Sequence, residues 1–345
     1  MCMSSSIISQ LAFTTNDIHV SKSTPSSYNP SSKQDEPGNR AFLPAYQRPQ
    51  ATYCSFWKNE MGNLLFLHGF PDVWYSWRHQ MVAMAATGFR AIAPDLPGYG
   101  LSEPPADLAQ ASWEGLMNDL LAILDSLSIS KVFLVAKDFG AQAAFDLSRC
   151  HPDCVCGVLS IGVPPLVDNI VFGGMPEGWY IYRWREPGRA EADFGRFNVR
   201  RIMRTIYILL SKSEVPVANQ GEEIMDLVDE STPMPHWITE EDLTYYTSLY
   251  EKSGFITTLH VPYRNKAAKL EYASPRFQVP MLVMIGEKDY VLKYPAMKEY
   301  MSSERLKEIA PHHEVTYIPE GCHYVQEQFP NLVNKLMIDL LCKHA

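Results

Sequence analysis

Short apolar runs alternate with longer amphipathic patterns along most of the chain from Leu64 onward. The runs are rich in Val, Leu and Ile and have the length of buried strands. They lie at Leu64–Leu67, Ala91–Pro94, Val132–Ala136, Val155–Gly162, Met281–Ile285 and Val315–Ile318. Strands that alternate with helices are typical of a parallel sheet with helices on both faces. The pattern therefore predicts an α/β fold with a mostly parallel sheet.

Two of the amphipathic patterns predict core-packing helices. Apolar residues recur at helical spacing first at Leu116, Leu120, Ile123 and Leu127, and again at Phe329, Leu332, Val333, Leu336, Met337 and Leu340. Ser112 precedes the first pattern and is a candidate N-cap for that helix. Both stripes are interpreted as core positions without a functional role.

Residues 1–60 differ in character from the rest of the chain. Serine clusters and several prolines leave little apolar periodicity, so we expect much of this segment to be disordered. It shows no convincing pair of strands, and Asp17–Val20 is only a weak candidate for one. Organelle targeting by the Ser-rich start is a less favoured alternative, because that start lacks the arginines that transit peptides favour.

Composition excludes several classes of function. The chain has 345 residues with 46% hydrophobic content, which is enough for a large core in one elaborated domain or two. The net charge of −9 argues against nucleic acid or an anionic membrane as a partner. No apolar run approaches the roughly 20 residues of a spanning helix. Seven scattered cysteines predict reduced thiols and a cytoplasmic protein.

One cluster of cysteines and a histidine could in principle bind a metal ion. Cys150, His151, Cys154 and Cys156 lie close together where a helix should end and a strand should begin. Their spacing does not match a zinc site, so we interpret them as structural residues. The sequence therefore predicts no metal site at this cluster.

The most informative stretch for function runs from Val132 to Gly140. An apolar strand leads into Asp138, which small residues flank two positions away on each side, at Ala136 and Gly140. This layout is typical of a nucleophile elbow, in which a tight strand-to-helix turn exposes one side chain. A carboxylate at the tip would form an ester with its substrate. The alternative is that Asp138 is simply a helix N-cap.

Three further segments, one before the elbow and two after it, occur in the order expected of an α/β-hydrolase fold. His68-Gly69-Phe70-Pro71 comes directly after a strand, where free backbone N–H groups could form an oxyanion hole. Gly286–Asp289 and Gly321–His323 each follow a later strand. Nucleophile, acid and histidine in that order match the α/β-hydrolase arrangement.

Between Gly162 and about Pro280 the alternation of strands and helices stops. Amphipathic patterns such as Phe197–Leu210 and Glu240–Tyr250 continue without a strand-like run. We expect an all-helical cap that covers the elbow and excludes water from an apolar pocket. The predicted organisation is an α/β-hydrolase core at 61–165 and 275–345, with the cap at 166–274.

From Asn63 to the C-terminus the chain resembles the soluble epoxide hydrolases of the α/β-hydrolase fold, and the plant branch most closely. The matching segments are Phe70–Arg78, Asp95–Ser102, Glu186–Ala192, Ser253–Phe255 and Val261–Arg264. One departure is at the elbow, where the family often has Gly-His-Asp-Trp-Gly and this chain has Ala-Lys-Asp-Phe-Gly at 136–140. Phenylalanine keeps an apolar wall there and leaves the backbone N–H unchanged.

The resemblance implies a role for each candidate site residue. Asp138 would be the nucleophile, His323 the base that activates water, and Asp289 the carboxylate that orients His323. The backbone N–H groups of Phe70 and Phe139 would form the oxyanion hole. The resemblance also places two cap phenols on the epoxide oxygen, Tyr180 and Tyr263, with Tyr182 as a competitor for the first position.

The expected reaction is hydrolysis of an epoxide to a vicinal diol through an aspartyl ester, with water as the second substrate. The resemblance suggests epoxy fatty acids or small aryl epoxides. A haloalkane-type dehalogenase is the nearest alternative, although such enzymes usually have a tryptophan next to the nucleophile, where this chain has Phe139. A non-catalytic ligand-binding relative is a further alternative. The sequence does not indicate an oligomeric state.

Overall fold

The computed structural model describes residues 19–22, 52–56, 61–108, 111–166, 174–265, 270 and 272–344. Within these residues, one eight-stranded sheet has the order β1-β2-β4-β3-β5-β6-β7-β8. The strands are β1 (His19–Lys22), β2 (Thr52–Phe56), β3 (Asn63–Leu67), β4 (Arg90–Pro94), β5 (Val132–Lys137), β6 (Val155–Ile161), β7 (Met281–Gly286) and β8 (His313–Ile318). All six strands that the sequence predicted are therefore present.

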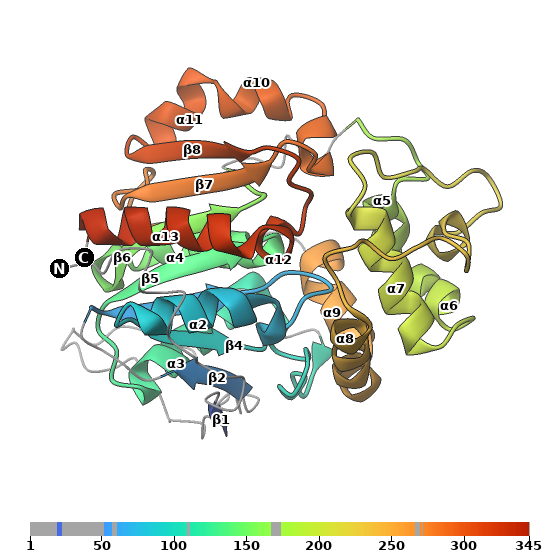
Figure 1. Ribbon diagram of the computed structural model, residues 1–345, viewed down its shortest axis with the longest axis horizontal. Helices are drawn as coiled ribbons and strands as arrows, with labels where there is room; N and C mark the ends of the chain where they lie inside the picture. The colour runs from blue at the N-terminus through green and yellow to red at the C-terminus, as the bar shows by residue number, and fades with distance from the viewer. Residues whose placement is uncertain are drawn as a thin grey trace, which may run out of the picture.

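The sheet is parallel except at one edge. β1 pairs antiparallel with β2, and β2 pairs antiparallel with β4. From β4 to β8 every neighbouring pair is parallel. Because parallel strands end at the same edge, the loops after β3, β5, β7 and β8 meet at one end of the sheet, as Figure 1 shows. The predicted α/β-hydrolase fold is confirmed.

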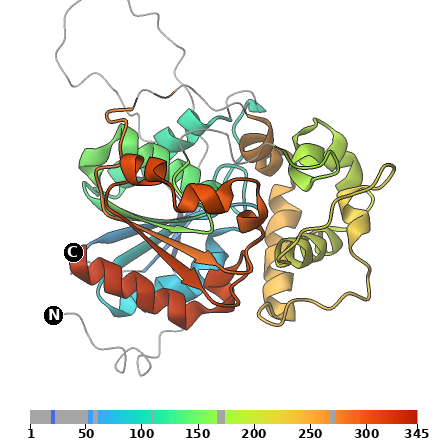
Figure 2. The same cartoon turned by 90° about the horizontal axis from the view of Figure 1, so that it is seen from above.

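Helices cover both faces of the sheet, as the alternation of elements predicted (Figures 1 and 2). The helices outside the cap are α2 (Arg78–Ala86), α3 (Trp113–Ser126), α4 (Phe139–Cys150), α10 (Met297–Met301), α11 (Glu304–Ile309), α12 (Val325–Gln328) and α13 (Pro330–His344). Short helical turns are η2 (Trp74–Trp77), η4 (Pro152–Cys154) and η8 (Tyr290–Lys293). The Ser112 hydroxyl accepts a hydrogen bond from Gly115 N, which confirms the predicted N-cap of α3.

Alternating strand residues divide the core into two layers. Leu64 and Phe66 of β3 pack with α2 and α13 on one face. Leu65 and Leu67 of the same strand pack with α3 and α4 on the other face. Both sets are fully buried, as expected for a strand with a helical layer on each side. The two layers hold the strand ends, and thus the site, in fixed positions.

The antiparallel edge corrects the expectation of disorder over residues 1–60. β1 begins at His19, inside the weak candidate Asp17–Val20, and β2 was not predicted. β2 is anchored by backbone pairing to β4 and by Thr52, whose N–H donates to Ser102 Oγ at 2.8 Å. Short strands at a sheet edge can form because a neighbouring strand pairs with them, even when their own sequences show little apolar periodicity. The rest of the segment lies outside the described residues.

A group of helices lies between β6 and β7 in sequence and beyond the carboxyl ends of the strands in space (Figure 1). These are α5 (Tyr180–Arg185), α6 (Arg189–Phe194), α7 (Val199–Leu210), η6 (Ile224–Leu227), α8 (Glu240–Ser253), α9 (Ile256–Leu259) and η7 (His260–Arg264). We refer to them as the cap helices. The precise limits of core and cap domains stay a prediction.

Buried ion pairs join the cap helices to the core. The guanidinium of Arg78 in α2 lies 2.9 Å from Asp242 in α8 and 2.6 Å from Glu327 in α12. The Tyr246 hydroxyl of α8 donates to the same Glu327 carboxylate at 3.0 Å. Burial raises the pKa of Glu327 to about 7, because Arg78 only partly compensates for it. Breaking one of these contacts would leave the other charged groups buried and unpaired. The network therefore holds the cap helices in one position on the core.

The cysteine expectation needs one correction. Cys342 in α13 is disulfide-bonded, so not all cysteines are reduced. Cys150, Cys154, Cys156 and Cys322 are free thiols. Scatter along the sequence does not exclude proximity in the fold, which is why the sequence alone could not predict a bond.

Candidate active site

Asp138 sits at a strained turn between β5 and α4. Its φ and ψ are 52° and −128°, a conformation that non-glycine residues seldom adopt. It occupies the N-cap position of α4, but its side chain makes no capping hydrogen bond. Strain without capping is what a nucleophile elbow predicts, and it argues against the N-cap alternative.

Two glycines make this turn possible. A Cβ on Gly140 would lie 2.4 Å from the Leu67 carbonyl oxygen, so only glycine lets α4 approach β3 this closely. A Cβ on Gly69 would lie 2.3 Å from Asp138 Oδ1. The segment after β3 and the elbow after β5 are therefore in direct contact.

The structure brings Asp138, His323 and Asp289 together. His323 Nδ1 lies 3.1 Å from each carboxylate oxygen of Asp289. His323 Nε2 lies 3.6 Å from Asp138 Oδ2. Asp289 is fixed in turn, because its carboxylate accepts a hydrogen bond from Val291 N at 3.0 Å. The arrangement leaves Nε2 facing the nucleophile while Nδ1 is held by a buried carboxylate.

Close backbone packing supports the loop after β8 that carries His323, which we call the histidine loop. A Cβ on Gly286 would lie 2.1 Å from the carbonyl oxygen of Gly321, so the ends of β7 and β8 touch. A Cβ on Gly162, at the end of β6, would lie 3.0 Å from Asp289 Oδ2. Small residues at these strand ends allow His323 and Asp289 to converge.

Opposing effects set the protonation of this group. Burial disfavours the Asp138 carboxylate, but hydrogen bonding to His323 and nearby positive charge outweigh it and lower its pKa. Burial and the Lys137 charge disfavour a protonated His323, yet the carboxylates of Asp289 and Asp138 outweigh both and raise its pKa. Asp138 is therefore ionised at neutral pH, as a nucleophile must be.

The segment after β3 points backbone N–H groups at the nucleophile. Phe70 N donates to Asp138 Oδ1 at 3.1 Å, and the N–H of Phe139 also hydrogen-bonds to this carboxylate. His68 supports the loop: its Nε2 accepts from Leu96 N at 3.0 Å, so the proton lies on Nδ1, which donates to Gly69 O at 2.8 Å. Burial lowers the pKa of His68 to about 4, which keeps the ring neutral.

Two cap tyrosines lie close together above the elbow. Tyr180 in α5 and Tyr263 in η7 are 3% and 4% exposed, and their ring centroids are 6.4 Å apart. The Tyr263 ring also contacts Phe139 and Phe70, at centroid distances of 5.1 and 5.7 Å. Burial, followed by neighbouring negative charge that includes Asp138, raises the pKa of both phenols well above the usual range. Both remain protonated donors.

Comparisons with known proteins agree with this geometry. The profile of the alpha/beta hydrolase fold family matches residues 62–330. Epoxide hydrolase 3 of Siraitia grosvenorii is 32% identical over 295 residues, which cover 81% of this chain and 92% of that protein. The chain belongs to the epoxide hydrolases of the α/β-hydrolase fold family.

Solved structures of epoxide hydrolases have the same architecture. A crystal structure of an epoxide hydrolase from Vigna radiata is 30% identical, with a TM-score of 0.77, and the match covers 86% of this chain and 95% of that one. A laboratory-evolved variant of a potato epoxide hydrolase is 29% identical, with a TM-score of 0.76, over 87% and 97% of the two chains. The similarity therefore includes the cap helices as well as the core.

The position of Tyr182 separates it from Tyr180. Tyr182 is half-buried, and its ring packs beside the Arg185 guanidinium, 5.9 Å from the centroid. Tyr180 instead packs against Tyr263 and donates or accepts a hydrogen bond with Tyr290 at 2.8 Å. Of the two competing cap tyrosines in this epoxide hydrolase, Tyr180 is the one that lies at the site.

Tyr290 is a site residue that sequence analysis missed. Besides its hydrogen bond to Tyr180, its ring lies 4.9 Å from that of His323. It therefore joins the cap phenol to the histidine loop. Its position directly after Asp289 was the available signal, but eighteen tyrosines in the chain made any one of them weakly informative.

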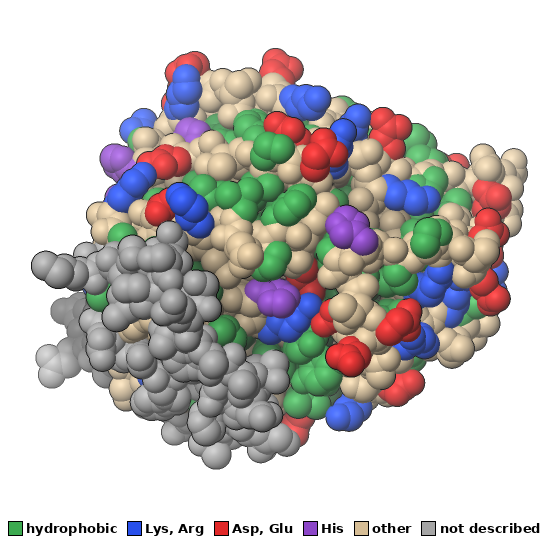
Figure 3. All heavy atoms as spheres, in the orientation of Figure 1, with side chains coloured by type: hydrophobic (Ala, Val, Ile, Leu, Met, Phe, Trp, Pro, Cys, Tyr) green, Lys and Arg blue, Asp and Glu red, His purple; other side chains and the backbone are tan. Residues whose placement is uncertain are grey.

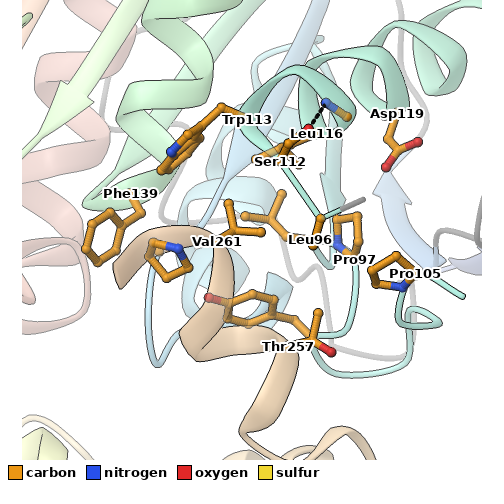
Figure 4. A pocket seen from close by; sticks show the side chains of 15 residues that line it. Leu96, Pro97, Pro105, Ser112, Trp113, Leu116, Asp119, Phe139, Thr257 and Val261 are labelled. Carbon is orange, nitrogen blue, oxygen red and sulfur yellow. Dashed lines mark hydrogen bonds between the residues drawn. The ribbon is translucent and has the colours of Figure 1, made fainter. Parts of the chain in front are cut away.

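A partly open pocket lies beside the elbow, on the side of α3 (Figure 4). Trp113, Phe139 and Leu96 face it from the core, while Thr257 and Val261 face it from the cap helices. Gly69, whose Cα lies beside Asp138, completes the inner end. The lining is mainly apolar, with Asp119 as an acidic member. The pocket suits an apolar group attached to the reacting carbon.

Other binding chemistry finds no support in the described residues. No cluster of three or more His, Cys, Asp or Glu side chains there is placed to hold a metal ion. No helix there is long and apolar enough to cross a membrane. On the described part of the face in Figure 3, acidic and basic side chains are interspersed. Such a surface does not resemble the positive patch of a nucleic-acid site.

Replacing Gly69 with alanine should reduce activity about 100-fold, because a displacement of the nucleophile of order 1 Å costs that much. The new Cβ would overlap Asp138 Oδ1, so the carboxylate must move away from Phe70 N. The measurement is turnover together with the melting temperature. Full activity in G69A would show that the loop after β3 does not position Asp138.

Proposed function

We propose that the protein hydrolyses an epoxide to a vicinal diol through an ester of Asp138. The observation that carries this proposal is the pair of buried, protonated phenols, Tyr180 and Tyr263, above a carboxylate nucleophile. An epoxide oxygen is a poor leaving group unless it receives hydrogen bonds or a proton as the C–O bond breaks. Two neutral phenols buried above the carboxylate can supply both.

In the first step, Asp138 Oδ2 attacks a ring carbon of the epoxide. Oδ1 is already held by the Phe70 N–H, and Oδ2 is the oxygen that faces His323. The C–O bond of the ring breaks, and its electron pair stays on oxygen. That oxygen takes a proton from one of the two phenols, Tyr180 or Tyr263, and a hydrogen bond from the other, which leaves the first as a phenolate. The product is a hydroxyalkyl ester of Asp138.

In the second step, His323 Nε2 takes a proton from water, and the resulting hydroxide attacks the carboxyl carbon of the ester. The negative charge develops on the oxygen next to the Phe70 and Phe139 N–H groups. Collapse of this anion breaks the bond to the substrate oxygen, which takes the proton from His323 and leaves as part of the diol. The proton left on the Asp138 carboxyl group returns to the phenolate, which restores both the carboxylate and the phenol. Asp289 stabilises the protonated ring between the two proton transfers.

The alternatives are less well supported. A dehalogenase needs an N–H donor for halide next to the nucleophile, and the side chain there is the apolar ring of Phe139, 5.1 Å from Tyr263. The similar proteins are named as epoxide hydrolases. A non-catalytic relative would not need the ionised carboxylate and the complete histidine pair described above.

The pocket favours an epoxide with an apolar substituent, and an epoxy fatty acid stays a prediction within that class. Its apolar lining can hold an alkyl or aryl group, whereas Asp119 does not favour a carboxylate nearby. The cytoplasmic location, expected from composition, likewise stays a prediction. So does the absence of a metal or organic cofactor, which is expected from the reaction that the resemblance implies.

Turnover of epoxides by the purified protein is the direct test. We expect diol formation from styrene oxide and from the methyl ester of an epoxystearate, and none from the same substrates with D138A. The matched comparison is epoxystearate as the free acid, which should react more slowly than its ester if Asp119 lies near the chain end. Absence of diol from every one of these substrates with the wild-type protein would overturn the proposed function.

A further inference from the structure

A buried ammonium group directly precedes the nucleophile, and the reaction described above does not use it. Lys137 and Asp72 are both 0% exposed, and Lys137 Nζ lies 3.1 Å from Asp72 Oδ2. The ammonium also lies over the ring of Tyr324, 4.4 Å from the centroid. A charge in such a position is costly unless it is paired, so its presence at this site calls for a function.

The pair is fixed from three sides of the active site. Lys137 is the last residue of β5, and Asp72 follows the segment that supplies the Phe70 N–H. The Tyr207 hydroxyl, from α7 of the cap, donates to Asp72 Oδ1 at 3.1 Å. The ammonium therefore cannot turn away without disturbing the elbow, the oxyanion segment and the cap together.

Lys137 and the nucleophile contact neighbouring residues of the loop that carries His323. Lys137 contacts Tyr324, while the next residue, Asp138, faces His323, the neighbour of Tyr324. Two adjacent residues of the elbow thus meet two adjacent residues of the histidine loop. This geometry brings the permanent positive charge close to both Asp138 and His323.

We propose that Lys137, held by Asp72, is a positioning residue that keeps His323 neutral once Asp138 has become an ester. The inference rests on the proposed function, because it concerns the second step of that reaction. In the resting enzyme the carboxylates of Asp138 and Asp289 both favour a protonated His323. Ester formation removes the negative charge of Asp138. Of the two carboxylates, only Asp289 then still favours protonation of His323, and the Lys137 charge still opposes it. A neutral His323 can accept the proton of water.

Few other charged groups reach these two residues. Those that face His323 are Asp289 and Tyr290 after β7, Asp138 and Lys137 at the elbow, and Tyr324 and Cys322 beside it in its own loop. Those that face Lys137 are Asp72, with His68 and Tyr207 beyond it, and Tyr324, Asp138, Asp289 and Cys322. Lys137 is the positive charge in this set. The principal charges that act on His323 include Lys137 but not Asp72, so removing the pair should raise the pKa of His323.

The test replaces the charged pair by a neutral one, in K137M/D72N, because the amide oxygen that D72N introduces can still accept the hydrogen bond from Tyr207. Without the positive charge the pKa of His323 in the ester rises, so the acid limb of ester hydrolysis should move up by about one pH unit. At a pH well below the wild-type acid limb, hydrolysis should then be about tenfold slower than in wild type, with rates near those of wild type at high pH. Single-turnover measurements separate this step from ester formation.

Two matched comparisons keep the result interpretable. K137R retains the charge and should retain the wild-type acid limb, whatever it does to the melting temperature. A rate lowered equally at every pH in K137M/D72N, with an unmoved acid limb, would reduce the pair to a structural role and overturn the inference. If that variant does not fold, the wild type decides: an acid limb of ester hydrolysis above about pH 6.5, the ordinary value of histidine, overturns it as well.

Failure of this inference can be told apart from failure of the proposed function. The mass of the Asp138 peptide after reaction with an epoxide reports the ester itself, independently of the pH profile. An ester that forms in K137R and in wild type, combined with an unmoved acid limb in K137M/D72N, rejects only the role of Lys137. Absence of the ester in samples of all three that are quenched within a single turnover, and also in His323→Gln, which lacks the base for ester hydrolysis, rejects the proposed mechanism.

Discussion

Replacing His323 with glutamine should stop turnover and leave substrate covalently attached to Asp138. The carboxylate needs no base to attack an epoxide, because its pKa is low and it is ionised already. Hydrolysis of the ester does need one, and loss of a general base typically slows a step 100- to 10,000-fold, a rough range from other enzymes. The ester should therefore accumulate. Mass spectrometry of the peptide that contains Asp138 would show an increase equal to the mass of the epoxide.

The control for this experiment is H323Q/D138A, which should bind substrate but gain no mass. Asp289→Asn is a graded comparison, because His323 loses a carboxylate 3.1 Å from Nδ1 but keeps its place at the site. In that variant the ester should accumulate only partly. An unmodified Asp138 peptide in H323Q, after substrate binding has been demonstrated, would favour direct attack by water and contradict the ester mechanism.

Much of the site could be predicted because its residues lie at strand ends. The strand before Asp138 is six residues long and fully buried, so its apolar pattern is strong and the residue that follows it is easily located. The same holds for β7, which precedes Asp289, whereas β8, which precedes His323, is buried only at Ile318 and has a weaker apolar pattern. A strand that packs on both faces leaves little freedom in where its carboxyl end lies.

The parts that were missed depend on contacts between segments far apart in the sequence. β2 is held in place by its pairing with β4 and by a hydrogen bond to Ser102. The residues of β2 themselves show no pattern that predicts a strand. Tyr290 gains its role from Tyr180 on the cap, 110 residues earlier. The partner of Lys137 is Asp72, and alternation along β5 indicated only that Lys137 and Asp138 point to opposite sides. Such pairings become visible only when the fold places the segments together.

Removing the hydroxyl groups of both cap tyrosines should nearly abolish epoxide opening. Each single change, Tyr180→Phe or Tyr263→Phe, removes one of two donors and should slow ester formation on the order of 100-fold. In the double variant the departing oxygen has neither phenol, so the rate should fall far below that of either single variant. The measurement is the rate of ester formation in single-turnover reactions. Hydrolysis of any ester that does form should change much less, since it depends on His323.

Tyr182→Phe is the matched control for this experiment, because it removes a phenol from the same helix, two residues away. Its half-buried ring packs beside Arg185, so ester formation should stay close to the wild-type rate. Tyr290→Phe should have an intermediate effect, because it removes the 2.8 Å partner that orients the Tyr180 hydroxyl while leaving both phenols in place. A silent Tyr180→Phe combined with a damaging Tyr182→Phe would mean that α5 is rotated from the position described above. The tyrosine pair would then have to be reassigned, although the arrangement of Asp138, His323 and Asp289 would stand.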